Sequence, residues 1–433
     1  MDIHFTYGKE GLNLKLPDES IIYTSSYKSS DEDVRKMMLH SISNPVGSHS
    51  LKHLLQKRKK GKIVIVVSDI TRPIPYYSFL PDLLEYILDQ GIRKDEIILL
   101  IATGMHRAST LQEKVYMFGQ SIVDNYQIID HRAEDNNELV SLPDKSWSGN
   151  EIKLNRHYVE AGFRIITGLV ETHFMSGFSG GRKSICPGLV SLDSIQLFHG
   201  YDFLNHSNAS NAILDNNPCH MENTSVARVC PADFSIHIIL DQNKKINCFF
   251  SGEPFDSHEA AVIYVKGKSC KTVEDLADAV ITSCGGYPLD DTFYQCVKGL
   301  VNCLPAIKEN GEIIAFGGCS EGIGSQEYEQ LMKKYSFRPD DFLNDIKNGL
   351  FFIKDQWQLQ MQIRVLKKTG LDNLHFYTAG ISQDELSLLF VNAHSFPENW
   401  MEKSLQIHIN SLAASGKKIA VFPEGPYCSP IEK

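Results

Sequence analysis

The stretch KIVIVVSDITRP, residues 62–73, joins an uninterrupted apolar run to an abrupt polar ending. Its Ile and Val residues show no polar alternation, which is typical of a β-strand buried on both faces. Comparable runs follow at EIILLIATG (96–104), YQIIDHR (126–132) and FRIITGLV (163–170). Between the first two runs, YYSFLPDLLEYILDQG (76–91) has helical spacing of Leu and Ile and ends in glycine. This β-α-β order predicts a parallel sheet and the α/β class.

The second half of the chain repeats the alternation. FSIHIILDQN and KINCFFSG are expected to be paired strands, and AVITSCGG and GEIIAFGGC flank a helix near 292–307. Further helices are predicted at 325–335, 338–349 and 355–369, and late strands at LHFYTAG, LSLLFV and KIAVFPEG. We place a domain boundary near 265–278, where KGKSCKTVEDL is polar and turn-prone. The prediction is an N-terminal α/β domain over 1–270 and a C-terminal α/β domain over 271–433, with the last strand packing back on the first domain.

Composition narrows the class of protein. The 433 residues include 53 acidic and 43 basic ones, a net charge of −10 without any long basic run. This argues against a nucleic-acid or membrane-surface protein. No apolar run approaches the ~18 residues that span a bilayer, and the N-terminus has no apolar signal region. The ten cysteines are scattered from Cys186 onward. Free thiols of this kind are typical of a reducing compartment, so we expect a cytoplasmic protein.

Each apolar run of the first half ends in a polar cluster. In open parallel sheets, ligands bind outside the carboxyl ends of the strands, so these clusters should share one rim. A single histidine in a loop is usually a surface residue, and Arg72 before Pro73 could simply pair with Asp69. The convergence of four such loops nevertheless favours a binding site. The residues expected at this rim are Asp69, Arg72, His106, His131, His173 and Lys183.

The stretch GFSGGRKS (177–184) resembles a phosphate loop but departs from its rule, because Arg182 precedes the lysine where glycine is required. Pro187 and Gly188 would also stop the long helix that such a loop opens. The interpretation of this stretch as a serine nucleophile motif fails too, since that motif needs a tight strand-to-helix turn. What remains is a glycine-rich backbone that can approach an anion, with hydroxyl donors at Ser179 and Ser184. Arg182 is expected to lower the pKa of the Lys183 amine, which would favour a nucleophilic lysine.

Taken together, the motifs resemble the lactate racemase family of nickel-pincer-dependent 2-hydroxy-acid racemases and epimerases. The resemblance covers nearly the whole chain. It lies in SDITRP, ATGMHR, GLVETHFMSGFSGGRKSICPG and FHG (198–200), and also in DTFYQCVKG, DQWQ and PEGPY. It implies two domains, an N-terminal Rossmann-like parallel sheet and a second α/β domain, with the active site in the cleft between them.

The resemblance also implies roles for individual residues. The family's cofactor is a pyridinium-derived mononucleotide that carries nickel in a pincer of sulfur and carbon ligands. The matching tether is Lys183 and the matching nickel ligand is His199. His106 and His173 match the acid/base pair. The cofactor-binding residues implied are Asp69, Thr71, Arg72, Ser179, Gly180, Gly181 and Lys183, and the substrate-binding residues are Arg72, Tyr294, Gln295 and Lys298.

The implied reaction inverts C2 of a 2-hydroxy acid through a 2-keto acid, with proton-coupled hydride transfer to the cofactor. Two imidazoles suit this reaction because inversion needs a base on either side of the carbon. Arg72 suits the binding of the substrate carboxylate, because its guanidinium fork can bind both oxygens. The implied partners are the substrate and the cofactor-maturation proteins, with no nucleic acid and no membrane. Phe174 and Met175, next to His173, are expected to line an apolar side-chain pocket.

Two alternatives remain at this stage. One is a histidine-rich metalloenzyme, a hydrolase or lyase that uses zinc or manganese. The other is a non-catalytic small-anion binding protein of the same fold. Tyr294, Gln295 and Lys298 share one helix face, which could be functional or merely exposed.

Overall fold

The four apolar runs of the first half are neighbouring strands of one sheet. In the computed structural model, which describes Met1–Lys433, they form β4 (Ile63–Ser68), β5 (Ile97–Ala102), β6 (Gln127–Asp130) and β9 (Phe163–Leu169). All four are parallel, in the order β9-β4-β5-β6. The first five residues of both β4 and β5 are buried. The predicted parallel sheet of doubly covered strands is therefore confirmed.

The same sheet is completed by β12 (Phe234–Leu240) and β13 (Ile246–Gly252). β12 is parallel to β9, whereas β13 runs antiparallel to β12 at the edge. The prediction of paired strands here is confirmed.

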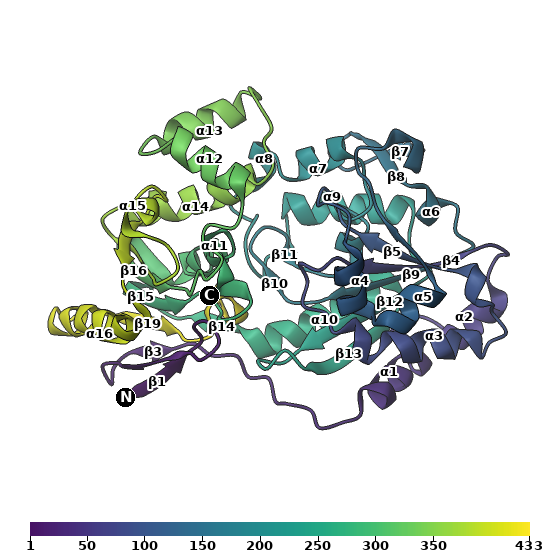
Figure 1. Cartoon of the computed structure of the whole chain (residues 1–433), viewed down its shortest axis with the longest axis horizontal. Coiled ribbons are helices and arrows are strands. Elements are labelled where there is room, and N and C mark those ends of the chain that lie inside the picture. Colours follow the sequence, from purple (N-terminus) through teal and green to yellow (C-terminus); the bar gives the residue numbers. More distant parts are fainter. The chain divides into compact units, whose positions relative to one another are not determined.

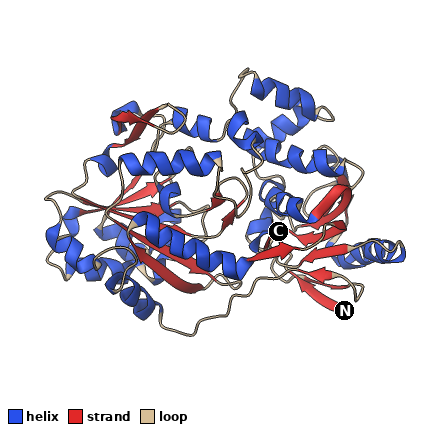
Figure 2. Ribbon diagram, turned by 180° about the vertical axis from the view of Figure 1, so that it is seen from behind, coloured by secondary structure: helices blue, strands red, loops and turns tan.

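Helices cover both faces of this sheet (Figures 1 and 2). One of them, α3, is the helix predicted between the first two strands. Its Leu80, Leu83 and Leu84 share a core with Ile63 and Ile65 of β4. The helices around this sheet are α1 (Val34–Ser43), α2 (Leu51–Lys57), α3 (Leu80–Leu88), α4 (Leu111–Phe118), α5 (Gln120–Asn125), α6 (Arg156–Val159), α7 (Leu192–Phe198), α9 (Pro218–Val229) and α10 (Pro254–Ser269). Two hairpins accompany them, β7 (Leu139–Lys145) with β8 (Glu151–Asn155), and β10 (Thr172–His173) with β11 (Gly177–Phe178).

The chain divides into two compact units. We call residues 27–199 and 213–268 the first-half unit, and residues 1–26, 200–212 and 269–433 the second-half unit.

The second-half unit has its own six-stranded sheet, which is parallel throughout. Its strands, in spatial order, are β18 (Asn392–Ser395), β17 (Leu374–Thr378), β16 (Ile307–Phe316), β15 (Ala277–Ser283), β19 (Ile419–Phe422) and β3 (Ile21–Ile22). The late strand β19 thus lies beside a strand from the first 26 residues. Smaller pairs are β1 (Asp2–Phe5) with β2 (Leu12–Lys15), and β14 (Cys270–Val273) with β20 (Ser429–Glu432).

One face of this second sheet is covered by α16 (Glu398–Ala414), whose Met401, Leu405 and Ile409 share a core with Ile314 and Phe316. The remaining helices are α8 (Tyr201–Asn205), α11 (Phe293–Asn302), α12 (Gln326–Lys334), α13 (Pro339–Lys347), α14 (Gln356–Thr369) and α15 (Gln383–Leu386). The helices predicted near 292–307, 325–335, 338–349 and 355–369 are therefore present.

Two predictions in this half are wrong. LSLLFV (386–391) is not a strand, because Ser382 caps the short helix α15 and Phe390 has a φ of +52°, outside the β region. The strand β18 begins only at Asn392. The expectation that KGKSCKTVEDL is turn-prone is wrong too, since α10 runs to Ser269 and β14 begins at Cys270.

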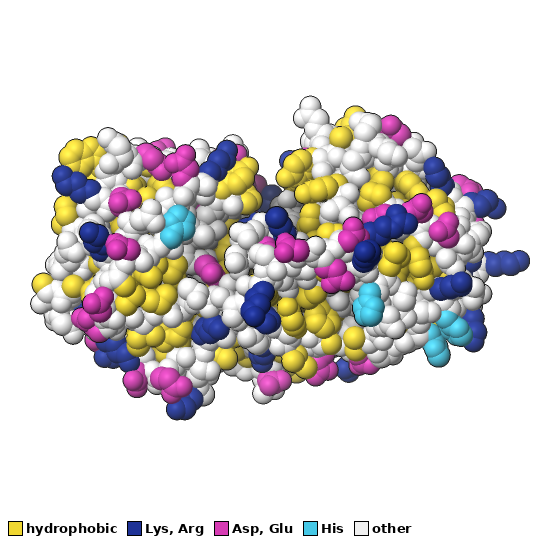
Figure 3. Space-filling model, turned by 90° about the horizontal axis from the view of Figure 1, so that it is seen from below, with side chains coloured by type: hydrophobic (Ala, Val, Ile, Leu, Met, Phe, Trp, Pro, Cys, Tyr) yellow, Lys and Arg dark blue, Asp and Glu magenta, His cyan; other side chains and the backbone are white.

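Acidic and basic side chains are mixed on the surface, as the similar numbers of both in the sequence lead one to expect. On the face shown in Figure 3, Lys and Arg side chains are interspersed with Asp and Glu side chains. None of the helices combines the length and apolar character needed to cross a membrane.

Candidate active site

Asp69 and His106 meet at the carboxyl ends of adjacent strands. Asp69 follows β4, His106 lies four residues beyond β5, and Ser68 is in register with Ala102. The Nδ1 of His106 donates a hydrogen bond to Oδ2 of Asp69 over 2.6 Å. The proton on Nδ1 leaves Nε2 unprotonated in the neutral ring. Since 43% of the His106 side chain is exposed, this base is accessible to a ligand.

Hydrogen bonds to the other carboxylate oxygen also hold Asp69 in place. Oδ1 accepts hydrogen bonds from the backbone N–H and the hydroxyl of Thr71, over 3.2 and 2.6 Å. Burial alone would raise the pKa of Asp69, but the hydrogen bond and charge of His106, with the Thr71 hydroxyl, outweigh it and lower that pKa. The carboxylate is therefore ionised and orients the His106 ring.

His173 lies in the β10–β11 hairpin that follows β9. Its Nδ1 accepts from the backbone N–H groups of Met175 and Ser176, over 3.2 and 3.3 Å. The neutral ring must therefore carry its proton on Nε2, which lies 3.4 Å from Nζ of Lys183. His106 and His173 thus present opposite proton states at Nε2. The neighbouring Phe174 and Met175 are 6% and 2% exposed, so they are buried in the protein.

Lys183 has an unusual amine. Its Nζ donates to Oγ of Ser176 over 3.1 Å and lies 5.3 Å from the centre of the Phe198 ring. Burial, followed by the positive charge of Arg72, lowers the pKa of Lys183 to about 7. The prediction of a lowered pKa is supported, but the cause differs, because Arg182 contributes less than either effect. A large fraction of this lysine is neutral and nucleophilic near neutral pH.

His199 ends α7. Its Nδ1 donates to the carbonyl of Ile195 over 3.0 Å, so Nε2 is the unprotonated nitrogen of the neutral ring. Burial and the charge of Lys183 lower the pKa of His199 to about 3. A neutral imidazole with its other nitrogen fixed by a carbonyl has the form in which histidine binds a metal.

The loop from Gly177 to Ser184 depends on its glycines. Gly180 and Gly181 have φ values of +73° and +54°, and a Cβ on Gly181 would come within 2.5 Å of the His258 ring. The hydroxyls of Ser179 and Ser184 donate to the carbonyls of Leu169 and Thr167. Their protons are therefore used inside the protein. Only a four-residue 3-10 turn, Gly181–Ser184, follows the glycines, which confirms that this is not a phosphate loop opening a long helix.

Arg182 is a buried cation without a carboxylate partner. Its Nη1 donates to Nδ1 of His258 over 2.9 Å, while Nε and Nη2 have no hydrogen-bond partner in the protein. Burial lowers the pKa of Arg182 to about 9. Unsatisfied buried donors are costly, so this guanidinium suits a bound anion. The partnership with His258, distant in sequence, left no signal in the sequence.

His131 does not belong to the rim, and its prediction there is wrong. Only 1% of the residue is exposed. Nε2 donates to the carbonyl of Val190 over 2.9 Å, and Nδ1 accepts from the amide of Asn155 over 3.2 Å. Both nitrogens are thus satisfied by the protein, and burial lowers the pKa of His131 to about 4. It is a core histidine that holds two loops together.

Arg72 forms an ion pair with an acid other than Asp69, the partner considered from the sequence. Its Nη1 lies 3.8 Å from Oε1 of Glu171, and both side chains are about a third exposed, 31% and 33%. Asp69 instead pairs with His106. Glu171 is part of the GLVETH motif, but its partnership with Arg72 was not predicted.

Tyr294, Gln295 and Lys298 lie on α11 of the second-half unit. The Tyr294 hydroxyl donates to Oδ1 of Asp355 over 2.9 Å and accepts from Nε1 of Trp357 over 3.2 Å. Oε1 of Gln295 is buried without a hydrogen-bond partner. An orphaned amide oxygen of this kind can accept a hydrogen bond from a ligand.

Comparisons with known proteins identify the family of the chain. Residues 7–212 match the lactate racemase N-terminal domain, and residues 272–425 match the lactate racemase C-terminal domain. The chain is 36% identical to a lactate racemase of Thermoanaerobacterium thermosaccharolyticum and 32% identical to one of Lactiplantibacillus plantarum, over 98% of both chains in each case. The solved lactate racemase apoprotein from Thermoanaerobacterium thermosaccharolyticum superposes with a TM-score of 0.86 at 32% identity, over the full length of both chains.

These matches decide among the classes left open by the sequence, in favour of a racemase over a hydrolase, a lyase or a binding protein. The chain belongs to the lactate racemase family and is an isomerase.

Proposed function

We propose that the protein interconverts the two enantiomers of a 2-hydroxy acid, with lactate as the first substrate to test. Lactate is chosen because the relatives of this chain are named lactate racemases. The observation that carries the proposal is the Lys183 amine, whose pKa is about 7 and which lies 3.4 Å from Nε2 of His173.

The residues fit a nickel-pincer nucleotide bound at Lys183. When bound, this group would supply the acceptor for the hydrogen that leaves C2 of the substrate. Lys183 can form the covalent link because much of its amine is neutral near pH 7. His199 offers an unprotonated Nε2 to nickel. The buried Arg182, with Nε and Nη2 unsatisfied, suits the phosphate of a mononucleotide.

The remaining cofactor contacts that we propose are Asp69, Thr71, Arg72, Ser179, Gly180 and Gly181. Attachment of the group would need maturation proteins as partners. Ser179, whose hydroxyl proton is directed to the Leu169 carbonyl, would contribute through its position in the loop and not as a hydroxyl donor.

His106 and His173 divide the proton transfers. The unprotonated Nε2 of His106 can accept the hydroxyl proton of one enantiomer, with Asp69 stabilising the resulting imidazolium. The protonated Nε2 of His173 can return a proton when the other enantiomer forms. One ring has an unprotonated Nε2 and the other a protonated Nε2, and this difference fits a reaction that must run in both directions.

The carboxylate of the substrate is proposed to bind Arg72, whose planar guanidinium matches two oxygens. Tyr294, Gln295 and Lys298 are proposed as the other substrate contacts. The orphaned Oε1 of Gln295 supports a role as an acceptor.

The test compares protein produced together with the maturation proteins as wild type, Lys183→Ala and the exposed control Lys60→Ala. Chiral chromatography should show racemisation of lactate by the wild type and the control only. Intact mass should show an added group on those two proteins and none on Lys183→Ala. Full activity or added mass in Lys183→Ala would refute the central step. A panel of enantiopure 2-hydroxy acids then identifies the substrate.

A further inference from the structure

A carboxylate lies within the apolar layer between α16 and the second-half sheet. Glu312 is on β16, two and four residues before Ile314 and Phe316, which pack under α16. Alternation along a strand therefore places Glu312 on the same face. Its side chain is only 11% exposed. A charge in this layer needs partners that compensate for its lost hydration.

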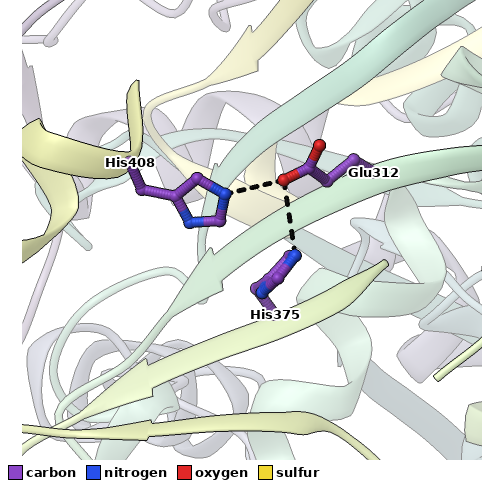
Figure 4. A group of neighbouring side chains, drawn as sticks. All are labelled: Glu312, His375 and His408. Carbon is purple, nitrogen blue, oxygen red and sulfur yellow. Dashed lines mark hydrogen bonds and ion pairs between the residues drawn. The ribbon is translucent and has the colours of Figure 1, made fainter. Parts of the chain in front are cut away.

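Two histidines supply those partners and converge on one oxygen. Nε2 of His408, on α16, lies 2.7 Å from Oε1 of Glu312, and Nε2 of His375, on β17, lies 3.3 Å from the same atom (Figure 4). The three ligand atoms all lie within 4.8 Å of one another. The other oxygen, Oε2, pairs with Nζ of Lys417 over 2.7 Å.

The outer nitrogen of each ring also has a fixed partner. Nδ1 of His408 lies 2.7 Å from the hydroxyl of Tyr377, and Nδ1 of His375 lies 2.9 Å from Nε2 of His394. A phenol and a neutral imidazole can each either donate or accept. Each ring can therefore place its proton on either nitrogen without losing its outer hydrogen bond.

We propose that Glu312, His375 and His408 form a zinc site that is separate in its residues from the proposed nickel centre. Two imidazoles and one carboxylate are a ligand set that zinc accepts, with water as the fourth ligand. Tyr377 and His394 are its outer positioning residues.

Two of the three separations between ligand atoms are close to those of a zinc site. Ligand atoms about 2.0–2.1 Å from a tetrahedral zinc ion lie roughly 3.3 Å apart. His375 already has this separation from Glu312, and His408 must move outward by roughly 0.6 Å. In the metal-free protein each Nε2 donates its proton to Glu312. On binding, the proton of each neutral ring moves to Nδ1 and zinc takes its place at Nε2.

The position of this site indicates a structural role. His375 is the second residue of β17, so the cluster lies near the amino-terminal end of that strand. Substrates of open parallel sheets bind at the opposite, carboxyl ends. Zinc here would connect β16, β17 and α16. Lys417, 40% exposed, can turn toward water as the positive ion enters.

The experiment uses the full-length chain, stripped with EDTA and titrated with Zn²⁺ against a chromophoric chelator. Wild type should bind one tight equivalent. His408→Ala and Glu312→Gln should each weaken binding by more than about 100-fold, since loss of a ligand exceeds the 10–100-fold effect of an outer partner. Tyr377→Phe, which keeps all three ligands, should weaken binding by about 10–100-fold.

Two control variants test whether other histidines bind the ion. His199→Ala removes the proposed nickel ligand, and His53→Ala breaks another close pair, His49 and His53, whose ring centres are 4.4 Å apart. Both should bind zinc as the wild type does. Loss of the tight equivalent in either control, or its retention in both His408→Ala and Glu312→Gln, overturns the proposal.

X-ray absorption of the zinc-loaded wild type keeps the test decisive if a ligand variant does not fold. Two imidazoles and one or two oxygens at about 2.0–2.2 Å support the site. A thiolate-containing shell, or only one imidazole, refutes it.

Discussion

The protein gathers histidines in two places, and the two places use the imidazole ring differently. In the first-half unit, the rings of His106, His173 and His199 are each fixed at Nδ1 by a different group: a carboxylate, backbone N–H groups and a carbonyl. In the second-half unit, His375 and His408 direct Nε2 at one shared oxygen of Glu312.

The difference separates rings that are each oriented by their own partner from rings that share one carboxylate oxygen. Rings oriented by separate partners at Nδ1 each have their own proton state at Nε2. Rings that converge on one oxygen leave room only for a proton or a small ion. The expected effects of changes in the two groups, in Lys183 beside the first group and in a histidine outside both, sharpen this contrast.

The largest effect is expected from removing either member of the acid/base pair. His106→Ala or His173→Ala should reduce racemisation by about 10²–10⁴-fold, because general acid–base catalysis contributes that much. Asp69→Asn should act in the same direction by releasing the His106 ring. Initial rates of both directions, measured by chiral chromatography, check this, with the exposed His49→Ala as a control. Near-normal turnover in both single histidine variants would exclude their paired role.

The next effect concerns the chemical reactivity of Lys183. With a pKa of about 7, roughly half of its amine is neutral at pH 7, against about one part in 2,500 for an ordinary lysine. A small acylating reagent should therefore modify Lys183 of the apoprotein first. Peptide mass spectrometry from pH 5 to 10 should give half-maximal labelling near pH 7. Labelling that rises only above about pH 9 would contradict the buried-amine interpretation.

A smaller effect is expected from His131, which belongs to neither group. Its pKa is lowered by burial from 6.5 to about 4, so below pH 6.5 the unfolded chain binds a proton that the folded protein does not. The stability it contributes is complete above pH 6.5 and falls by about 3 kcal/mol as the pH drops to about 4. Urea unfolding across this range should show a shallower acid loss in His131→Gln. Identical slopes would argue against a neutral buried His131.

The smallest effect is expected from metal removal. If zinc joins α16 to the second sheet, EDTA should lower the melting temperature of zinc-loaded protein by about 5 °C, from binding linkage. Thermal unfolding of His408→Ala should not respond to zinc or EDTA. An equal response in that variant would show that the stabilising ion binds elsewhere.

Much of the fold could be predicted because it rests on local patterns. The Ile- and Val-rich runs became β4, β5, β6 and β9, and helical spacing located α3. A strand prediction was wrong where the backbone of one residue departed from the β region. This residue is Phe390, whose φ of +52° lies within the apolar run LSLLFV.

Part of the site could also be predicted from the sequence, because it too depends on local patterns. Polar residues that follow parallel strands share an edge, and Asp69 and His106 do meet there. His131 follows a strand too, yet it turned inward, since Val190 and Asn155 satisfy both of its nitrogens. Sequence position could not distinguish these two histidines.

By itself the sequence determined the α/β class, the parallel strands and the family, because hydrophobic periodicity and the long motif GLVETHFMSGFSGGRKSICPG are encoded in consecutive residues. Only the tertiary structure decided the proton state of each imidazole, the burial that lowers the pKa of Lys183, and the meeting of Glu312 with His375 and His408. Those properties depend on hydration and on atoms from distant segments, which come together only when the chain packs.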